Sequence, residues 1–120
     1  MQRILIAEDD PVLSMIYEIT LAEAGFEVLL CQDGQEAFEV LESFAPDLVI
    51  TDHAMPRMSG GELVSAVRRM LPGAITLMAS AVDARLLKDD QHADARLEKP
   101  ITPGRLLQTV RALEAAQLPA

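Results

Sequence analysis

The chain has 120 residues, half of them apolar, which predicts one domain over residues 1–120 with a single core and no second domain. Its formal net charge of −9, from 10 Lys plus Arg against 19 Asp plus Glu, argues against nucleic acid or an anionic membrane as a partner and favours a basic counterpart. No apolar run approaches the roughly 18 residues of a membrane span, and the apolar start is too short for a signal peptide, so we expect a cytoplasmic protein.

Short apolar runs alternate with amphipathic helical stretches along the whole chain. This alternation is typical of an α/β fold, a doubly wound parallel sheet with helices on both of its faces. Three of the runs are almost continuously apolar, as central strands are. The predicted strands are Arg3 to Ala7, Glu27 to Cys31, Leu48 to Thr51, Ile75 to Ala79 and Ala95 to Leu97.

Helices are predicted between and after these strands. The first has Asp10 as its cap, Pro11 in its first turn and its end at Gly25. The pattern is weakest between the fourth and fifth strands, where residues 84–88 offer one or two turns, so we expect a shortened fourth helix. The other helices are predicted from Gly34 after Asp33, from about Gly61 to Leu71, and from Pro103 after Thr102.

Apolar residues at helical spacing predict which face of each helix packs on the sheet. The predicted inward-facing residues are Val12, Leu13, Ile16 and Ile19 in the first helix; Ala37, Phe38, Leu41 and Phe44 in the second; Leu63, Val64, Val67 and Met70 in the third; and Leu106, Leu107, Val110 and Leu113 in the last.

Polar side chains stand where the predicted strands end. Glu8 and Asp9 follow the first strand, and Asp52 follows the third. If these strands are neighbours, the three acids share one crevice, where they cannot all stay ionised without a cation. Ser80 follows the fourth strand and Lys99 the fifth. Singly, each residue is explained as a cap, a turn residue or a solvated charge, but together they predict a site for a divalent metal.

Five segments of the chain carry a family pattern. They are Ile4-Leu5-Ile6-Ala7-Glu8-Asp9-Asp10-Pro11, Pro46-Asp47-Leu48-Val49-Ile50-Thr51-Asp52-His53-Ala54-Met55-Pro56, Met58-Ser59-Gly60, Ala79-Ser80-Ala81 and Glu98-Lys99-Pro100. In these segments the chain resembles the receiver (CheY-like) domain of bacterial two-component response regulators, of the stand-alone single-domain type. The resemblance implies a flavodoxin-like fold with strand order 2-1-3-4-5 and a cis peptide bond between Lys99 and Pro100.

The resemblance also implies phosphoryl chemistry. A carboxylate can attack a phosphoryl group only if nearby positive charge offsets the repulsion between the two anions. Oxygen ligands favour Mg²⁺, with Mn²⁺ as a substitute, over zinc. We expect a phosphoacceptor that catalyses only its own phosphoryl transfer and dephosphorylation, and no other enzyme activity. The implied roles are phosphoacceptor for Asp52, phosphate-binding lysine for Lys99, switch hydroxyl for Ser80, and metal ligands for Glu8, Asp9, Asp52 and the backbone carbonyl of Ala54.

The chain departs from the family pattern at three positions. Arg96 stands three residues before the lysine, where the family usually has a Tyr or Phe whose rotamer reports phosphorylation. Arg96 is therefore a candidate for the output face, with a solvated arginine on an edge strand as the alternative. Ala54 and Val82 offer no polar side chain to orient water near the phosphoryl group.

The sole cysteine, Cys31, is interpreted as a small apolar residue at a strand end.

Three functions are compatible with the sequence. The favoured one is a response regulator that takes a phosphoryl group from a histidine kinase or phosphotransfer protein and then signals by protein contact, or acts as a phosphate shuttle or sink. It is expected to be a single receiver domain over residues 1–120 without an output domain, and a monomer or a weak phosphorylation-dependent dimer. The alternative is a receiver-like module that binds its partner without phosphorylation. The third is a phosphatase of the haloacid dehalogenase type, but such enzymes usually carry a second Asp where this chain has Ala54.

Overall fold

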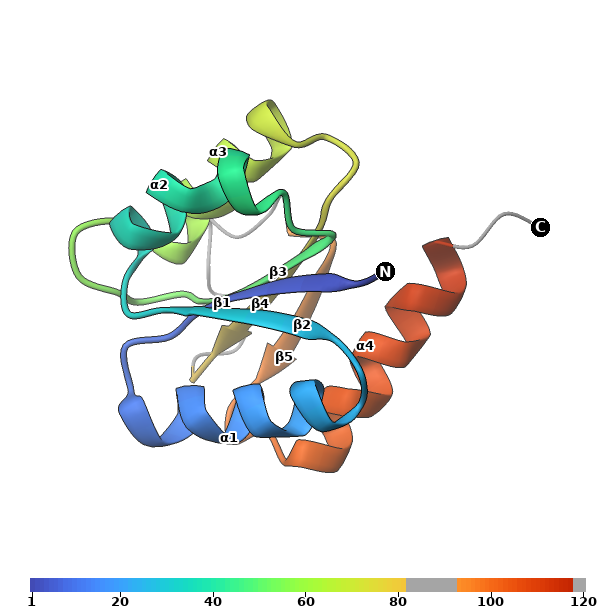
Figure 1. Ribbon diagram of the computed structural model, residues 1–120. Helices are drawn as coiled ribbons and strands as arrows, with labels where there is room; N and C mark the ends of the chain where they lie inside the picture. The colour runs from blue at the N-terminus through green and yellow to red at the C-terminus, as the bar shows by residue number, and fades with distance from the viewer. Residues whose placement is uncertain (82–92, 118–120) are drawn as a thin grey trace.

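The computed structural model describes residues 1–81 and 93–117. Five parallel strands form one sheet in the order β2-β1-β3-β4-β5, which confirms the predicted fold class and strand order (Figure 1). The strands are β1 (Arg3–Ala7), β2 (Glu27–Cys31), β3 (Leu48–Asp52), β4 (Ile75–Ser80) and β5 (Ala95–Glu98).

Three strands extend one residue beyond their predicted ends. Pairing in register continues to Asp52, which lies opposite Ala79, and to Ser80, which lies opposite Glu98. Asp52 and Ser80 are therefore the last residues of β3 and β4 and do not belong to the loops that follow. The backbone of both residues is held by the sheet, which fixes where their side chains start.

Helices cover both faces of the sheet (Figure 1). α1 (Pro11–Glu23) and α4 (Pro103–Gln117) lie on one face, and α2 (Gly34–Phe44) and α3 (Gly60–Met70) lie on the other. α4 is the last of the predicted helices, the one that follows Thr102. The short helix predicted over 84–88 lies outside the described residues, as does Val82. No helix in the described ranges is long and apolar enough to cross a membrane.

Side chains at the N-termini start the helices where the sequence predicts. The carboxylate of Asp10 accepts hydrogen bonds from the first backbone N–H groups of α1, and Asp33 does the same for α2. Ser59 and Glu62 form a reciprocal capping box, so α3 begins at Gly60, one residue before the predicted start. Asp10 and Ser59 directly follow segments that contain site residues, so these two caps fix the ends of those segments.

The inward faces predicted for three of the helices are confirmed. Their central residues are buried, most of them in two cores on opposite faces of the sheet and Val64 in a small cluster with Met78 and Ala93, and the flanking residues are partly buried against the two cores. The buried members are Ala37 and Leu41 in α2, Leu63, Val64 and Val67 in α3, and Leu106 and Val110 in α4, with Phe38, Phe44, Met70, Leu107 and Leu113 partly buried.

The inward face predicted for α1 is wrong in part. Val12 and Ile19 are 57% and 50% exposed, whereas Tyr17 and Leu21 are fully buried. The other two predicted residues of this face are half-buried. Positions spaced by four residues along α1 meet the sheet, and this places Val12 and Ile19 on the outer side together with Met15, which is 51% exposed. Apolar character alone did not distinguish the two sides, because both carry apolar residues.

Cys31 is buried at the end of β2, as predicted. Burial, assisted by the negative charges of Glu36 and Asp33, raises the pKa of its thiol to about 12. The thiolate form is therefore negligible at neutral pH, and Cys31 acts as a small apolar residue of the core.

The start of β5 is anchored to β4 through Asp94. Its Oδ2 accepts hydrogen bonds from the backbone N–H of Thr76 at 2.8 Å and from the Thr76 hydroxyl at 3.1 Å. The backbone N–H of Asp94 in turn donates to Thr76 Oγ1 at 3.0 Å. Thr76 is fully buried, so its own N–H and hydroxyl have no access to water. Arg68 adds an ion pair at 3.5 Å from Asp94 Oδ1.

Asp94→Ala should lower the free energy of unfolding by about 1–3 kcal/mol, because it leaves a buried N–H and a buried hydroxyl of Thr76 without their acceptor. Asp94→Asn keeps an acceptor oxygen and should cost less. Urea denaturation of the two variants measures the difference. Equal losses in both would contradict this explanation and assign the effect to the lost charge opposite Arg68.

Candidate functional site

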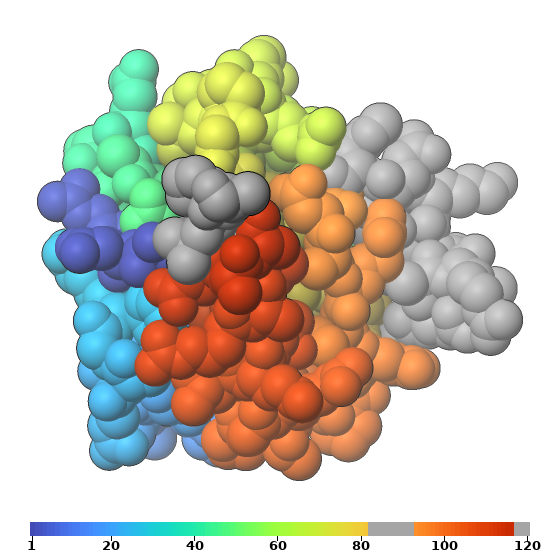
Figure 2. Space-filling model, turned by 90° about the vertical axis from the view of Figure 1, so that its right-hand side faces the viewer, coloured from blue at the N-terminus to red at the C-terminus, as the bar shows by residue number. Residues whose placement is uncertain are grey.

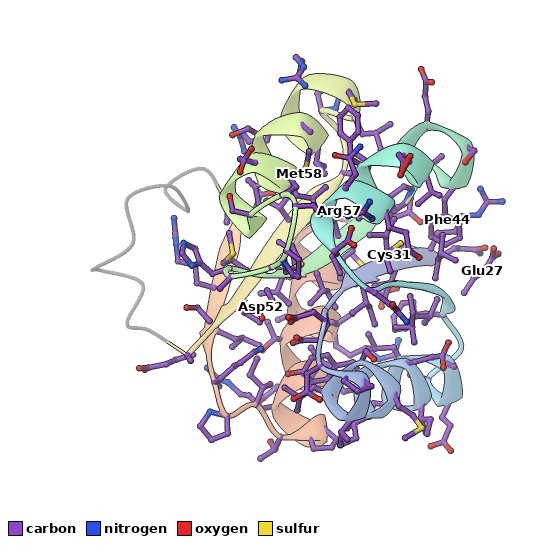
Figure 3. All side chains as sticks on the ribbon, turned by 90° about the vertical axis from the view of Figure 1, so that its left-hand side faces the viewer. Glu27, Cys31, Phe44, Asp52, Arg57 and Met58 are labelled. Atoms are coloured by element: carbon purple, nitrogen blue, oxygen red, sulfur yellow. The ribbon has the colours of Figure 1, made fainter. Side chains whose placement is uncertain are left out.

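Three acids meet at the carboxyl edge of the central strands. β1 and β3 are neighbours, with Ala7 opposite Thr51, so Glu8 and Asp9 lie beside Asp52. One carboxylate oxygen from each acid lies within 4.8 Å of those of the other two. Figure 3 looks onto this edge, where Asp52 is labelled. The prediction that the three acids share one crevice is confirmed.

The three acids differ in their access to solvent. Glu8 is 3% exposed, Asp52 is half-buried and Asp9 is exposed, so the crevice is closed at Glu8 and open at Asp9. The three side chains offer only oxygen donors, the ligand type that Mg²⁺ and Mn²⁺ prefer. The donor set therefore fits a hard divalent cation.

Lys99 places positive charge among these acids. Its Nζ lies 2.8 Å from Glu8 Oε1 and 3.2 Å from Asp52 Oδ2. Burial works to lower the pKa of the ammonium group, but the hydrogen bond to Glu8 and the charge of Asp52 outweigh it and raise that pKa. Lys99 is thus a cation at any physiological pH. The peptide bond between Lys99 and Pro100 is cis, as the resemblance implies.

Glu8 is the most enclosed acid of the site. Burial raises the pKa of its carboxyl, and the negative charge of Asp52 acts in the same direction. The bonds from Lys99 and from the backbone N–H of Asp10, at 3.2 Å, lower it and offset part of the rise. Three carboxyl groups surround one lysine, and a further cation would relieve the repulsion that helps to raise the pKa of Glu8.

The remaining predicted residues occupy three different surroundings. Ser80 is 5% exposed at the end of β4, on the strand next to Asp52. Ala54 is exposed in the loop after β3. Arg96 is exposed on β5, which lies at the surface beside α4 in Figure 2. The structure thus places Ser80 at the end of the strand beside that of Asp52, while its role as switch hydroxyl and the output role of Arg96 stay predictions.

Two features near the site were missed by the sequence analysis. The hydroxyl of Tyr17 is buried without a hydrogen-bond partner among the described residues, and burial raises its pKa. The positive charge of Lys99 acts to lower the pKa of Tyr17, and the negative charges of Glu8 and Asp52 act to raise it. Spacing by four residues along α1 could have identified Tyr17 as inward-facing. The second feature is an ion pair between Asp33 and Arg57, 24 residues apart, for which the sequence carries no local signal.

The fold and the crevice define a class of protein: a flavodoxin-like α/β domain with a carboxylate and lysine site at the carboxyl edge of its sheet. The family model described as "Response regulator receiver domain" matches residues 4–111. The chain belongs to this family, the receiver domains of two-component response regulators. Members are generally phosphoacceptors that bind Mg²⁺ in an acidic pocket and interact with histidine kinases or phosphotransfer proteins.

Similar curated proteins include longer response regulators. Response regulator MprA of Mycolicibacterium vanbaalenii is 35% identical over 114 residues, which cover 92% of this chain and 49% of that protein. The DNA-binding response regulator MtrA of Mycolicibacterium smegmatis is 32% identical over 113 residues, 92% of this chain and 50% of that one. The chain thus spans about half the length of these relatives.

Solved receiver structures share the fold closely. Chemotaxis response regulator CheY4 of Vibrio cholerae has a TM-score of 0.86 at 30% identity, covering 94% of this chain and 98% of that chain. Response regulator TrrA of Thermotoga maritima, solved in complex with Mg²⁺ and BeF, has a TM-score of 0.85 at 30% identity, covering 94% and 99%.

Proposed function

We propose that this chain is a Mg²⁺-dependent phosphoacceptor that takes a phosphoryl group on Asp52 from a histidine kinase or phosphotransfer protein. The observation that carries the proposal is the arrangement around Asp52: two further carboxylates within 4.8 Å and a lysine ammonium at 3.2 Å. The acids suit a divalent cation, and the lysine suits a phosphoryl anion.

In the proposed reaction, a carboxylate oxygen of Asp52 attacks phosphorus and forms an O–P bond as the N–P bond of the donor phosphohistidine breaks. The electron pair of the broken bond stays on the donor imidazole, which is protonated by solvent. The ammonium group of Lys99 pairs with the free carboxylate of Asp52 before the reaction and with the phosphoryl oxygens after it. Ser80, at the end of the adjacent strand, donates its hydroxyl to one of these oxygens.

The metal would be held by Glu8, Asp9 and Asp52, with the backbone carbonyl of Ala54 as a further oxygen ligand. When bound, Mg²⁺ supplies the positive charge that lets a carboxylate approach a phosphoryl anion. The open side of the crevice at Asp9 leaves a path by which both the metal and the donor can enter.

We further propose that α1 forms part of the surface that meets the donor protein. Val12, Met15 and Ile19 form an exposed apolar stripe on the helix that begins directly after Asp9 and Asp10. A groove of about 350 Å³ runs beside it. The groove is lined by residues that include the carboxylates Glu8, Asp9, Glu18 and Glu36. An apolar stripe beside acidic groups suits a partner helix with apolar and basic side chains.

Ile19→Glu should slow phosphoryl transfer from a histidine-phosphorylated protein donor by about tenfold, because a charge replaces an exposed apolar contact. Phosphorylation by acetyl phosphate should be unchanged, because the small donor does not contact α1. Ser65→Glu, which adds the same charge to an exposed position of α3 on the opposite face, is the matched control. Equal loss with both donors would contradict a docking role.

Intact-protein mass spectrometry tests the main proposal. After incubation with acetyl phosphate and Mg²⁺, the chain should carry a single phosphoryl adduct, and chelation of the metal should prevent it. Absence of an adduct with acetyl phosphate and also with a histidine-phosphorylated donor would refute the proposal. It would favour the receiver-like module that works without phosphorylation.

A further inference from the structure

The loop that leaves Asp52, residues 53–59, contains a strained three-residue turn. The backbone N–H of Met58 donates to the carbonyl of Pro56 at 2.8 Å, and Arg57 between them has a φ of 69°. A turn of this size with positive φ at its centre is rare, and a residue with a side chain is strained there. Some other interaction must hold Arg57 in this conformation.

That interaction is a forked ion pair between Arg57 and Asp33. The Arg57 Nε donates to Asp33 Oδ2 at 3.0 Å, and Nη2 donates to Oδ2 at 2.8 Å and to Oδ1 at 3.1 Å. Asp33 is fixed in turn, because its Oδ1 accepts the backbone N–H of Glu36 at 2.8 Å as the N-cap of α2. Figure 3 shows Arg57 and Met58 near α2 and α3, on the side of the molecule that carries Asp52.

Close backbone contacts leave the loop little other freedom. A Cβ atom on Gly34 would overlap the carbonyl oxygen of Met58, so the tip of the loop lies directly against the start of α2. A Cβ atom on Gly60 would overlap the carbonyl oxygen of Asp52, and the Gly60 N–H donates to His53 O at 2.8 Å. The base of the loop is thus closed by the backbone, and at its tip the ion pair between Arg57 and Asp33 adds to the close contact between Met58 and Gly34.

We propose that Arg57 is a positioning residue for metal binding: its ion pair with Asp33 holds the loop so that the Ala54 carbonyl faces the acid cluster. This inference rests on the proposed function, in which that carbonyl is a metal ligand. Ala54 lies three residues before Arg57, within the same loop. Without the ion pair the strained turn relaxes, and the carbonyl loses its fixed direction.

An effect of charge alone and an effect of loop positioning predict different changes in Mg²⁺ affinity when Arg57 or Asp33 is replaced. Removal of the positive charge of Arg57 would by itself strengthen binding of a cation nearby, and removal of the negative charge of Asp33 would weaken it. Loss of the ion pair as a positioning device weakens binding in both cases. The direction of the change in the Arg57 variant therefore separates the two explanations.

The test compares the Mg²⁺ affinity of the natural chain with that of Arg57→Ala, Asp33→Asn and the double variant. Asparagine is as good an N-cap as aspartate, so Asp33→Asn removes the ion pair without removing the cap of α2. Each single variant should bind Mg²⁺ roughly tenfold more weakly, the lower end of the effect known for groups that contact a metal ligand directly. The double variant should be no weaker than either single one, because both remove the same interaction.

Titration of backbone amide chemical shifts with MgCl₂ measures the affinity, and urea denaturation measures stability in parallel. Arg57→Lys, which keeps the charge and can still reach a carboxylate, should restore part of the affinity. Arg69→Ala removes an exposed positive charge near the end of α3 and should leave the affinity unchanged. A role in stability alone would lower the free energy of unfolding of the Arg57 variants without changing their affinity.

Unchanged or tighter Mg²⁺ binding in Arg57→Ala would overturn the positioning role. If the natural chain binds Mg²⁺ and loses it in Asp52→Asn, such a result leaves the proposed function standing. If the natural chain itself does not bind Mg²⁺, both the proposed function and this inference fail together.

Discussion

Asp52→Asn should abolish the phosphoryl adduct with acetyl phosphate and with a histidine-phosphorylated donor alike. The amide keeps the size of the side chain but lacks the anionic oxygen that would attack phosphorus. It also removes one of the three carboxylates that lie within 4.8 Å of one another, so Mg²⁺ affinity should fall as well. Intact-protein mass spectrometry measures the adduct.

Asp10→Asn is the matched control for this loss. Asp10 lies next to Asp9 in the chain but serves as the N-cap of α1, and asparagine keeps that function. The variant should therefore be phosphorylated like the natural chain. An adduct that persists in Asp52→Asn would show that another residue accepts the phosphoryl group.

Asp52→Asn also distinguishes signalling that requires phosphorylation from binding that does not. If the chain signals through its phosphorylated form, Asp52→Asn should lose binding to a target that the phosphorylated chain binds. Full binding by Asp52→Asn would support the module that works without phosphorylation. In that case replacement of the exposed Arg96 by Ala becomes the next comparison.

Lys99→Ala should slow phosphorylation by acetyl phosphate by about a hundredfold, comparable to loss of one preorganised donor at a site of developing charge. Its Nζ lies 3.2 Å from Asp52 Oδ2, so it can follow the charge onto the phosphoryl group. The change also leaves Glu8, which is 3% exposed, without the ion pair at 2.8 Å. A rate assay followed by mass spectrometry measures the first effect.

Lys99→Arg keeps the positive charge and serves as the control. Its planar fork differs in shape from an ammonium group, so part of the rate should return. Urea denaturation of both variants shows how much of any loss comes from unfolding. A natural rate in folded Lys99→Ala would mean that the lysine does not meet the phosphoryl group.

The order of strands and the gathering of the acids were predictable from the sequence because both follow from local patterns. Apolar runs that end in Glu8-Asp9 and Asp52 identify buried strands with acids at one edge, and parallel strands bring those ends together. The caps Asp10 and Asp33 likewise act within four residues of their own position. Such short-range signals can be recognised in the sequence alone.

Long-range contacts were not predictable in the same way. Val12 and Ile19 were assigned to the core of the fold because they are apolar, but the packing of α1 turns them outward. The ion pair of Arg57 with Asp33 joins residues 24 positions apart, and each has an ordinary local explanation as a loop residue or a cap. Only the folded chain shows that they meet.

The central claim is that Asp52 is the residue that accepts the phosphoryl group. The measurement that addresses this most directly is to phosphorylate the chain in the presence of Mg²⁺, reduce the product with borohydride and locate the modified residue by peptide mass spectrometry. An acyl phosphate on Asp52 is reduced to homoserine, so homoserine at position 52, absent when the metal is chelated, is the predicted result. Modification at any other residue, or an unmodified Asp52 after exposure to both donors, would contradict the account.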